Sequence, residues 1–150
     1  MAGRVLPRQP FLVQDRLDPR WEQYLRSLLD VPEWLGVAEV VDQAAAIAST
    51  PIVVVGRLAA GIYRISYYAR ITRAAGISSS LTVRFNWTDG SVAQFELGAA
   101  MIGNTTATVQ QNRLMVRVDR DTSITYETGY ASVGVPTMQY SLRIALERLQ

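Results

Sequence analysis

The feature that most constrains the fold is a long run of alternating side chains between residues 63 and 72. Apolar or aromatic residues occupy every second position, and mostly polar residues lie between them. A period of two places successive side chains on opposite faces of a β-strand. Tyr68 belongs to the polar, outward face. The other face is expected to form part of the core, and it consists of Tyr63, Ile65, Tyr67, Ala69 and Ile71.

The same period recurs later in the chain. After a break at residues 74–76, a second alternating strand continues to Trp87, and a long regular strand at 138–147 is expected to lie centrally in a sheet. About eight strands with no helices between them predict an all-β fold, an antiparallel sandwich or barrel of jelly-roll type. The second strand's inward face is Leu81, Val83, Phe85 and Trp87.

The remaining strands carry weaker signals. Short strands are expected at 105–109, 114–118 and 123–127, separated by Gln-Asn and Asp-Arg-Asp turns. Residues 52–55 form a continuous apolar run, which is typical of a strand buried on both faces. Residues 37–48 suit either a helix or a strand, and the strand is favoured.

A hairpin is expected where Asp89 and Gly90 follow the second strand. A two-residue turn at these positions would place Phe95 opposite Arg84 and so mix the two faces. A three-residue loop, 89–91, would instead place Phe95 opposite Phe85. The sequence therefore predicts an odd-length or bulged turn.

The N-terminal third lacks this period, so the chain is predicted to comprise an arm at 1–35 and a β-domain at 36–150. Residues 1–17 suggest an extended arm, although a disordered terminus is an open alternative. Asp18 and Pro19 can start a short amphipathic helix that ends near Asp30. The large apolar residues of this arm must be shielded from water, either by a neighbouring subunit or by packing on the open end of the β-domain. With Tyr68, the candidate interface residues are Phe11, Leu12, Trp21, Tyr24, Leu25 and Trp34.

Composition excludes several classes of function. The chain has no histidine, cysteine or lysine, and all fifteen basic residues are arginine. Ser-His-Asp and Cys-His catalysis and the usual zinc sites are therefore absent. A carboxylate pair for glycoside hydrolysis could come from Asp89, Glu96, Asp119, Asp121 or Glu127, but most of these fall in expected turns or on outward faces, so we expect no enzyme, cofactor or metal. The net charge of +2 is scattered, and no apolar window approaches about 18 residues, so we expect neither nucleic acid nor membrane as a partner.

The segments beginning at Gly61 (Gly-Ile-Tyr-Arg-Ile-Ser-Tyr), Phe85 (Phe-Asn-Trp-Thr-Asp-Gly), Gly103 (Gly-Asn-Thr-Thr-Ala-Thr) and Tyr130 (Tyr-Ala-Ser-Val-Gly-Val-Pro) carry a family resemblance. Over residues 50–149 the chain resembles the small trimeric decoration, or cement, proteins on the heads of thermophilic tailed phages. The opening strand also resembles that of the trimeric TNF-like jelly rolls. Arginine as the only cation and the lack of cysteine suit a hot source or a GC-rich genome equally.

The resemblance implies a structural virion protein that decorates and stabilises a capsid. It would be a homotrimer on the capsid surface, assembled in the host cytoplasm, and would contact the major capsid protein and neighbouring decoration subunits. The arm would latch onto those neighbours. A receptor- or carbohydrate-binding module of a tail fibre, which would use Tyr68, is the alternative, and a spacer at the head-tail joint is a third.

Overall fold

The computed structural model describes residues 33–52 and 58–149, together with four short pieces of the N-terminal region. The chain divides into two compact units, Met1–Pro32 and Glu33–Gln150. The second unit thus begins three residues before the predicted boundary. A β-strand begins at Glu33. For residues 37–48, where a strand was favoured over a helix, the strand is confirmed as far as Gln43.

In the first unit, the described strands β1 (Leu12–Val13) and β2 (Arg16–Leu17) pair antiparallel. The stretch predicted as an extended arm therefore contains a short hairpin. Trp21 and Leu25 are helical and half-buried. The other residues of the predicted helix lie outside the described residues.

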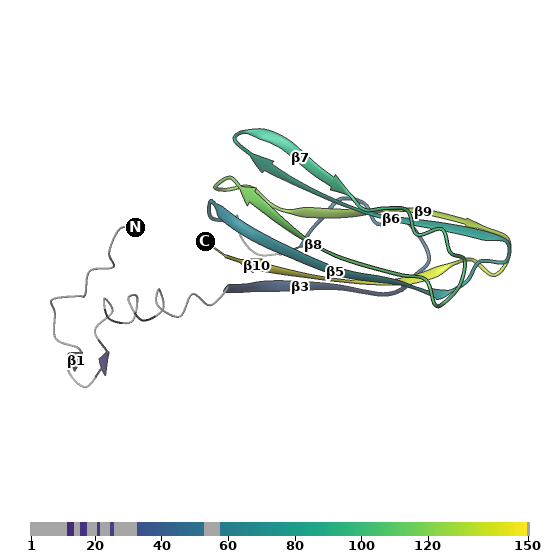
Figure 1. Ribbon diagram of the computed structural model, residues 1–150, viewed down its shortest axis with the longest axis horizontal. Coiled ribbons are helices and arrows are strands. Elements are labelled where there is room, and N and C mark those ends of the chain that lie inside the picture. The colour runs from purple at the N-terminus through teal and green to yellow at the C-terminus, as the bar shows by residue number, and fades with distance from the viewer. Residues whose placement is uncertain are drawn as a thin grey trace. The chain divides into compact units, whose positions relative to one another are not determined.

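The described part of the second unit is a sandwich of two antiparallel four-stranded sheets (Figure 1). One sheet has the order β3-β10-β5-β8, and the other has the order β4-β9-β6-β7. Successive strands alternate between the sheets, except for the β6-β7 hairpin. This order is that of a jelly roll, so the predicted fold class is confirmed. The strands are β3 (Glu33–Gln43), β4 (Thr50–Pro51), β5 (Gly61–Arg73), β6 (Ser78–Asp89), β7 (Val92–Leu97), β8 (Val109–Val118), β9 (Thr125–Val133) and β10 (Gln139–Arg148).

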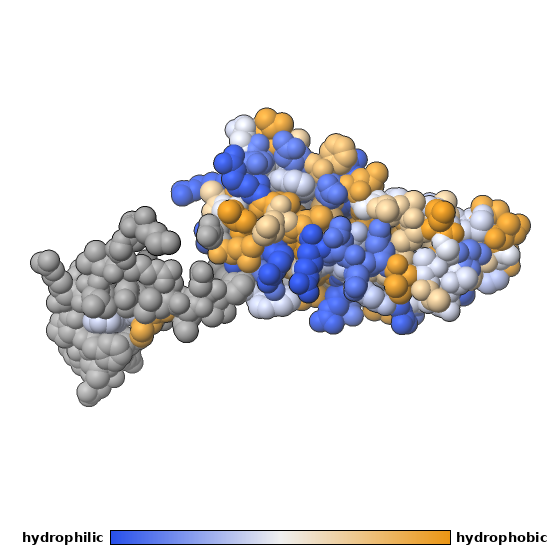
Figure 2. All heavy atoms as spheres, viewed as in Figure 1, coloured by the Kyte–Doolittle hydropathy of each residue, from blue (hydrophilic) through white to orange (hydrophobic). Residues whose placement is uncertain are grey.

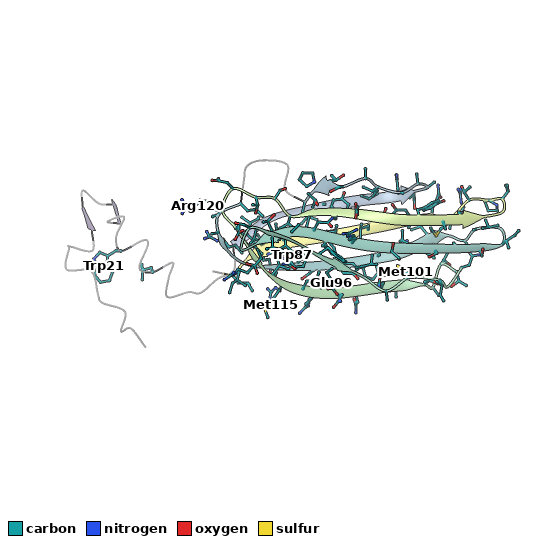
Figure 3. All side chains as sticks on the ribbon, turned by 90° about the horizontal axis from the view of Figure 1, so that it is seen from above. Trp21, Trp87, Glu96, Met101, Met115 and Arg120 are labelled. Carbon is teal, nitrogen blue, oxygen red and sulfur yellow. The ribbon has the colours of Figure 1, made fainter. Side chains whose placement is uncertain are left out.

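The core lies between the two sheets and follows the predicted alternation. All five residues of the apolar face of β5 are buried, as are Leu81, Val83 and Phe85 of β6. Trp87 packs against this core, whereas Met115 on β8 projects away from the strands (Figure 3). β10 lies between β3 and β5, so its predicted central position is also confirmed. Burying each large apolar side chain contributes about 1.5–3 kcal/mol.

A hydrogen-bonded chain of polar groups crosses this core. Thr128 Oγ1 accepts the backbone N–H of Ile47 at 2.8 Å and donates to the Tyr140 hydroxyl at 2.8 Å. Tyr140 in turn donates to the carbonyl of Ala45 at 2.9 Å. Burial raises the pKa of the Tyr140 phenol, so the hydroxyl keeps the proton that it donates. This chain attaches the segment after β3 to β9 and β10.

Replacing Tyr140 by phenylalanine should lower the free energy of unfolding by about 1–3 kcal/mol, because the substitution leaves the Ala45 carbonyl without its donor. Urea denaturation followed by circular dichroism measures the change. Tyr68→Phe is the matched control, since that hydroxyl bonds to none of the described residues and its loss should change stability little. Equal stability of the two variants would contradict the role assigned to the Tyr140 hydroxyl.

The edge of the first sheet differs from the prediction. β8 begins at Val109, so residues 105–108 of the first expected strand lie outside it, and it continues without a break through the expected turn to Val118. Gln111 and Asn112, read as a turn, remain in the strand because they pair with Tyr68 and Tyr67 of β5. An edge strand accommodates polar residues, because solvent reaches both of its faces. β9 similarly extends to Val133, beyond the strand expected at 123–127.

The predicted hairpin register is wrong. Asp89 pairs with Val92, which leaves a two-residue turn at Gly90 and Ser91, with positive φ angles of 60° and 63°. Such a turn matches the twist of the flanking strands. The prediction assumed that Phe95 points inward, but all six residues of β7 are exposed and Phe95 pairs with Asn86. Of the run at 52–55, only Ile52, which is buried, is described.

Asp119 in the neighbouring loop holds this turn. Its two carboxylate oxygens accept the backbone N–H groups of Ser91 at 2.7 Å and Gly90 at 3.0 Å. The Arg117 side chain, which donates to Asp89 at 2.6 Å, contributes a favourable charge nearby. Chiefly through the bond from Ser91, and then that from Gly90, these contacts lower the pKa of Asp119 below its ordinary value of 3.8.

Because the folded-state pKa of Asp119 is depressed, its stabilising effect should be present above pH 3.8 and disappear as the pH falls through the folded value. Asp119→Asn should therefore unfold more readily than the parent at pH 7, and the difference should shrink on acidification. Thermal unfolding over a pH series tests this. Asp121→Asn, which removes a carboxylate bonded to none of the described residues, should show no such pH-dependent difference.

Candidate functional site

The outer face of the β3-β10-β5-β8 sheet carries a row of polar and aromatic side chains. Tyr68 on β5 lies between its cross-strand partners, Arg143 on β10 and Gln111 on β8. Arg143 in turn pairs with Glu39 on β3. Because inward residues of the same strands fill the core, this row is directed outward. Tyr68 is 42% exposed, which confirms the predicted outward position of that side chain.

Two further arginines lie on the rows that flank Tyr68. Arg70 is two residues further along β5, and Arg113 is the cross-strand partner of Ser66 on β8. Alternate residues of a strand share a face and lie about 7 Å apart, so Arg70, Arg113 and Arg143 surround the tyrosine on three sides. None of the three forms an ion pair with a described residue. We define Tyr68, Arg70, Gln111, Arg113 and Arg143 as the Tyr68 face.

Two hollows adjoin this face, and Tyr68 and Arg143 line both. The larger has a volume of about 540 Å³ and extends from Ser66 of β5 towards β8, where Gln111 and Arg113 form its wall. The smaller, of about 330 Å³, extends towards β3 and is lined by Arg70 and Glu39 among others. A ligand longer than either hollow could therefore cross the tyrosine and contact arginines on both sides. In Figure 2, hydrophilic side chains form bands between hydrophobic patches on the visible surface of the sandwich.

The Tyr68 face presents side chains that can bind an anionic group and a flat apolar surface. An arginine fork can donate two parallel hydrogen bonds to a carboxylate or phosphate, and the face of a tyrosine ring can stack on a flat apolar surface. Three arginines near one carboxylate, Glu39, leave a local positive charge. Among the described residues, no cluster of histidine, cysteine, aspartate and glutamate could hold a metal ion. Within the same part of the chain, no helix is long and apolar enough to cross a membrane.

Of the other predicted interface residues, Trp34 is the one in the second unit, and it lines neither hollow. Trp34 lies in β3, 61% exposed, opposite Glu147 at an irregularity of the strand pairing. Leu12, Trp21 and Leu25 belong to the first unit. Phe11 and Tyr24 lie outside the described residues.

Sequence reasoning identified Tyr68 but missed its neighbours. Arg70 and Arg143 occupy outward positions of strands that were predicted correctly, so their place on the surface was available from the alternation. Gln111 and Arg113 were missed because residues 111–112 were read as a turn. Only the pairing of β8 with β5 places them beside Tyr68.

Apolar side chains are exposed at the end of the sandwich formed by the β5-β6 and β9-β10 connections. Ile77 is 72% exposed and Val135 is 91% exposed. Hydrogen bonds from Ile77 to Val133 and from Gly76 to Pro136 tie the two connections together. This end is therefore a defined apolar surface and a second candidate for contact with another molecule.

Comparisons with known proteins give little beyond the fold. No model of a known protein family matches the sequence, and no curated protein is significantly similar to it. Among solved structures, the chain is similar to the carbohydrate-binding module CBM6cm-2 of Cellvibrio mixtus lichenase 5A, solved in complex with cellotriose. The identity is 16%, the match covers 77% of this chain and 89% of the module, and the TM-score is 0.34. A likeness this weak carries no argument about a ligand.

Proposed function

We propose that this protein is a non-catalytic structural component of a phage virion, which decorates the capsid as a trimer and contacts the major capsid protein through the Tyr68 face. The observation that carries the binding role is the group of three arginines, without ion-pair partners among the described residues, around an exposed tyrosine. Arginine and tyrosine are enriched in protein interfaces, where they give rigid contact area and directed hydrogen bonds. The phage setting rests on the sequence resemblance.

A positively charged face fits an acidic partner surface. These arginines have no ion pair with a described residue to break when they dock, so docking exchanges their hydrogen bonds to water for bonds to carboxylates. The exposed apolar end of the sandwich and the separate N-terminal unit would add further contacts. Several weak contacts made by one trimer reinforce one another.

The second candidate is a receptor- or carbohydrate-binding module of a tail fibre. Tyr68 favours it, because a sugar ring can stack on an exposed aromatic face while Gln111 and the arginines bond to its hydroxyl or carboxylate groups. The two hollows on either side of Tyr68 would then hold successive sugar units.

Reversing one charge on this face should weaken capsid binding. Arg143→Glu would add a second carboxylate beside Glu39 and is expected to reduce retention on purified empty capsids by about tenfold, or about 1.4 kcal/mol. Co-sedimentation at several concentrations measures this. Arg120→Glu is the control, because Arg120 is exposed in the turn before β9 and makes the same charge change elsewhere. If both variants lost capsid binding equally, the change in net charge would explain the loss, and the position of Arg143 would not matter.

A glycan array with the parent and Tyr68→Ala separates the two candidates. Sugar binding that depends on Tyr68, without affinity for capsids, would favour the fibre module. Capsid binding without sugar binding would favour decoration. Unaltered capsid binding by both Tyr68→Ala and Arg143→Glu would exclude the Tyr68 face as the contact.

The latch role of the N-terminal segment has its own test. Removing residues 1–20 should leave the second unit folded, because none of its described strands includes those residues. Retention on capsids should fall, since the contacts of the arm would be lost. Circular dichroism and co-sedimentation measure the two effects, and light scattering establishes whether the trimer persists. Unchanged retention would contradict the latch.

A further inference from the structure

The outer edge of β7 is open. β7 ends its sheet, and nothing among the described residues pairs with its second edge. All six of its residues are exposed, including Val92 at 57%, Phe95 at 58% and Leu97 at 54%. Its only charged residue is Glu96. Native proteins usually protect such an edge with charges, proline or a bulge, because unpaired backbone groups readily accept another strand.

The other long edges of the sandwich carry such protection. β8 presents Arg113 and Arg117 as exposed residues. β3 contains Glu33, Glu39 and Asp42, and its pairing with β10 shifts register twice. β7 is regular in its pairing and mostly apolar. This contrast indicates that the edge of β7 is suited to pair with another strand.

The alternation of backbone hydrogen bonds along β7 shows which of its N–H and C=O groups are free to bond to another strand. Gly98, directly after the strand, donates its N–H to the carbonyl of Val83 on β6 at 2.8 Å. Residues alternate between bonding one neighbour and the other. Even-numbered residues of β7 therefore direct their N–H and C=O groups towards β6. Ala93, Phe95 and Leu97 direct theirs towards the open edge.

We propose that β7 binds the β7 strand of a second copy of this chain, antiparallel, about a two-fold axis that passes through Phe95. In this register Phe95 lies opposite Phe95 of the second copy, and Ala93 lies opposite Leu97. The two-fold axis produces the Ala93–Leu97 pair twice, so there are three pairs. Each exchanges two backbone hydrogen bonds, about six in all, and every free backbone group of the strand is satisfied. The two sheets become one continuous sheet of eight strands.

The side chains agree with this register on both faces. On the outer face, the Phe95 pair is flanked by Ala93 and Leu97, which gives an apolar strip. Arg84 already lies over the Phe95 ring, 4.2 Å from its centroid, and would cover the strip. On the inner face Gln94 lies opposite Glu96, so an amide N–H can donate to a carboxylate. No like charges are opposed.

Other registers fit less well. An axis through Gln94 would oppose Phe95 to Ala93 and leave the backbone groups of Leu97 unpaired. It would also place Glu96 opposite the apolar Val92. An axis between two residues would put outward side chains opposite inward ones, because the side-chain period is two. The Phe95 register alone pairs every free group and matches both faces.

This contact is independent of the proposed function. It belongs to the edge of the second sheet, whereas the Tyr68 face belongs to the first. On a capsid, a two-fold contact of this kind would join a subunit of one trimer to a subunit of the next.

Cysteine cross-linking tests the register directly, because the natural chain has no cysteine. In the proposed pair, the two Cα atoms at position 95 lie about 5.5 Å apart, within the range of about 4.4–6.8 Å that a disulfide spans. Phe95→Cys in the full chain, oxidised mildly without capsids, should give a covalent dimer on a non-reducing gel. Ala93→Cys alone should not, since its two copies would be about 13 Å apart.

A second pair of variants keeps Phe95 in place. Ala93→Cys mixed with Leu97→Cys should give a mixed covalent dimer, whereas each protein alone should remain uncross-linked. Met115→Cys, at a 76% exposed position of the edge strand β8, is the control for random collision. Light scattering over a concentration series should show reversible association that Phe95→Lys abolishes.

The outcomes are distinct. Cross-linking by Phe95→Cys and by the mixture, but not by Ala93→Cys alone, supports the register. Equal cross-linking by all the variants indicates random collision and overturns it, as does a folded protein in which neither combination cross-links. Because capsids are absent, failure here leaves the capsid proposal untouched, and failure to bind capsids leaves this contact untouched.

Discussion

The rest of the structure depends on the pairing of β5 with β10, whose inner faces are buried along most of their length. Tyr63, Ile65, Ile144 and Leu146 are fully or almost fully covered. A slip of one residue would reverse the faces of the strand that moves. It would bury Arg64 if β5 moved or Arg143 if β10 moved, and would expose that strand's core residues, at a cost of many kilocalories per mole. Burial of the inner faces therefore fixes the register of β5 and β10, and this register determines the positions of Tyr68 and Arg143 on the outer face.

This coupling explains how the outer face of the sheet can present a defined surface. Tyr68, Arg70 and Arg143 each have a buried residue before and after them in the strand, and Gln111 and Arg113 are held by the pairing of β8 with β5. Rigid presentation reduces the entropy lost when a partner binds. Arg70, Arg113 and Arg143 remain free of ion pairs with described residues, in contrast to Arg64, Arg84 and Arg117, which pair with carboxylates. The protein thus separates structural arginines from arginines available for binding.

In edge strands, the hydrophobic pattern is a weaker guide to which side chains point inward. Among the described residues, β7 and β8 each lack a neighbouring strand on one side, and polar side chains reach water along all of β7 and most of β8. The hydrophobic pattern then no longer reports which face is inside. In β7 the turn chemistry of Gly90 and Ser91, held by Asp119, determines the register. The consequence is a strand whose apolar side chains lie outside, where a second copy could cover them.

From the sequence alone, the β class, the jelly-roll type, the inward faces of β5, β6 and β10 and the outward position of Tyr68 could all be predicted. These features follow from a period of two over long, half-buried strands, where burial dominates the free energy. The hairpin register, the continuity of β8 and the arginines around Tyr68 depend on which strands become neighbours. That choice depends on contacts between residues far apart in the chain, such as Tyr68 with Gln111 and Asp119 with Ser91, and only the tertiary structure decides it.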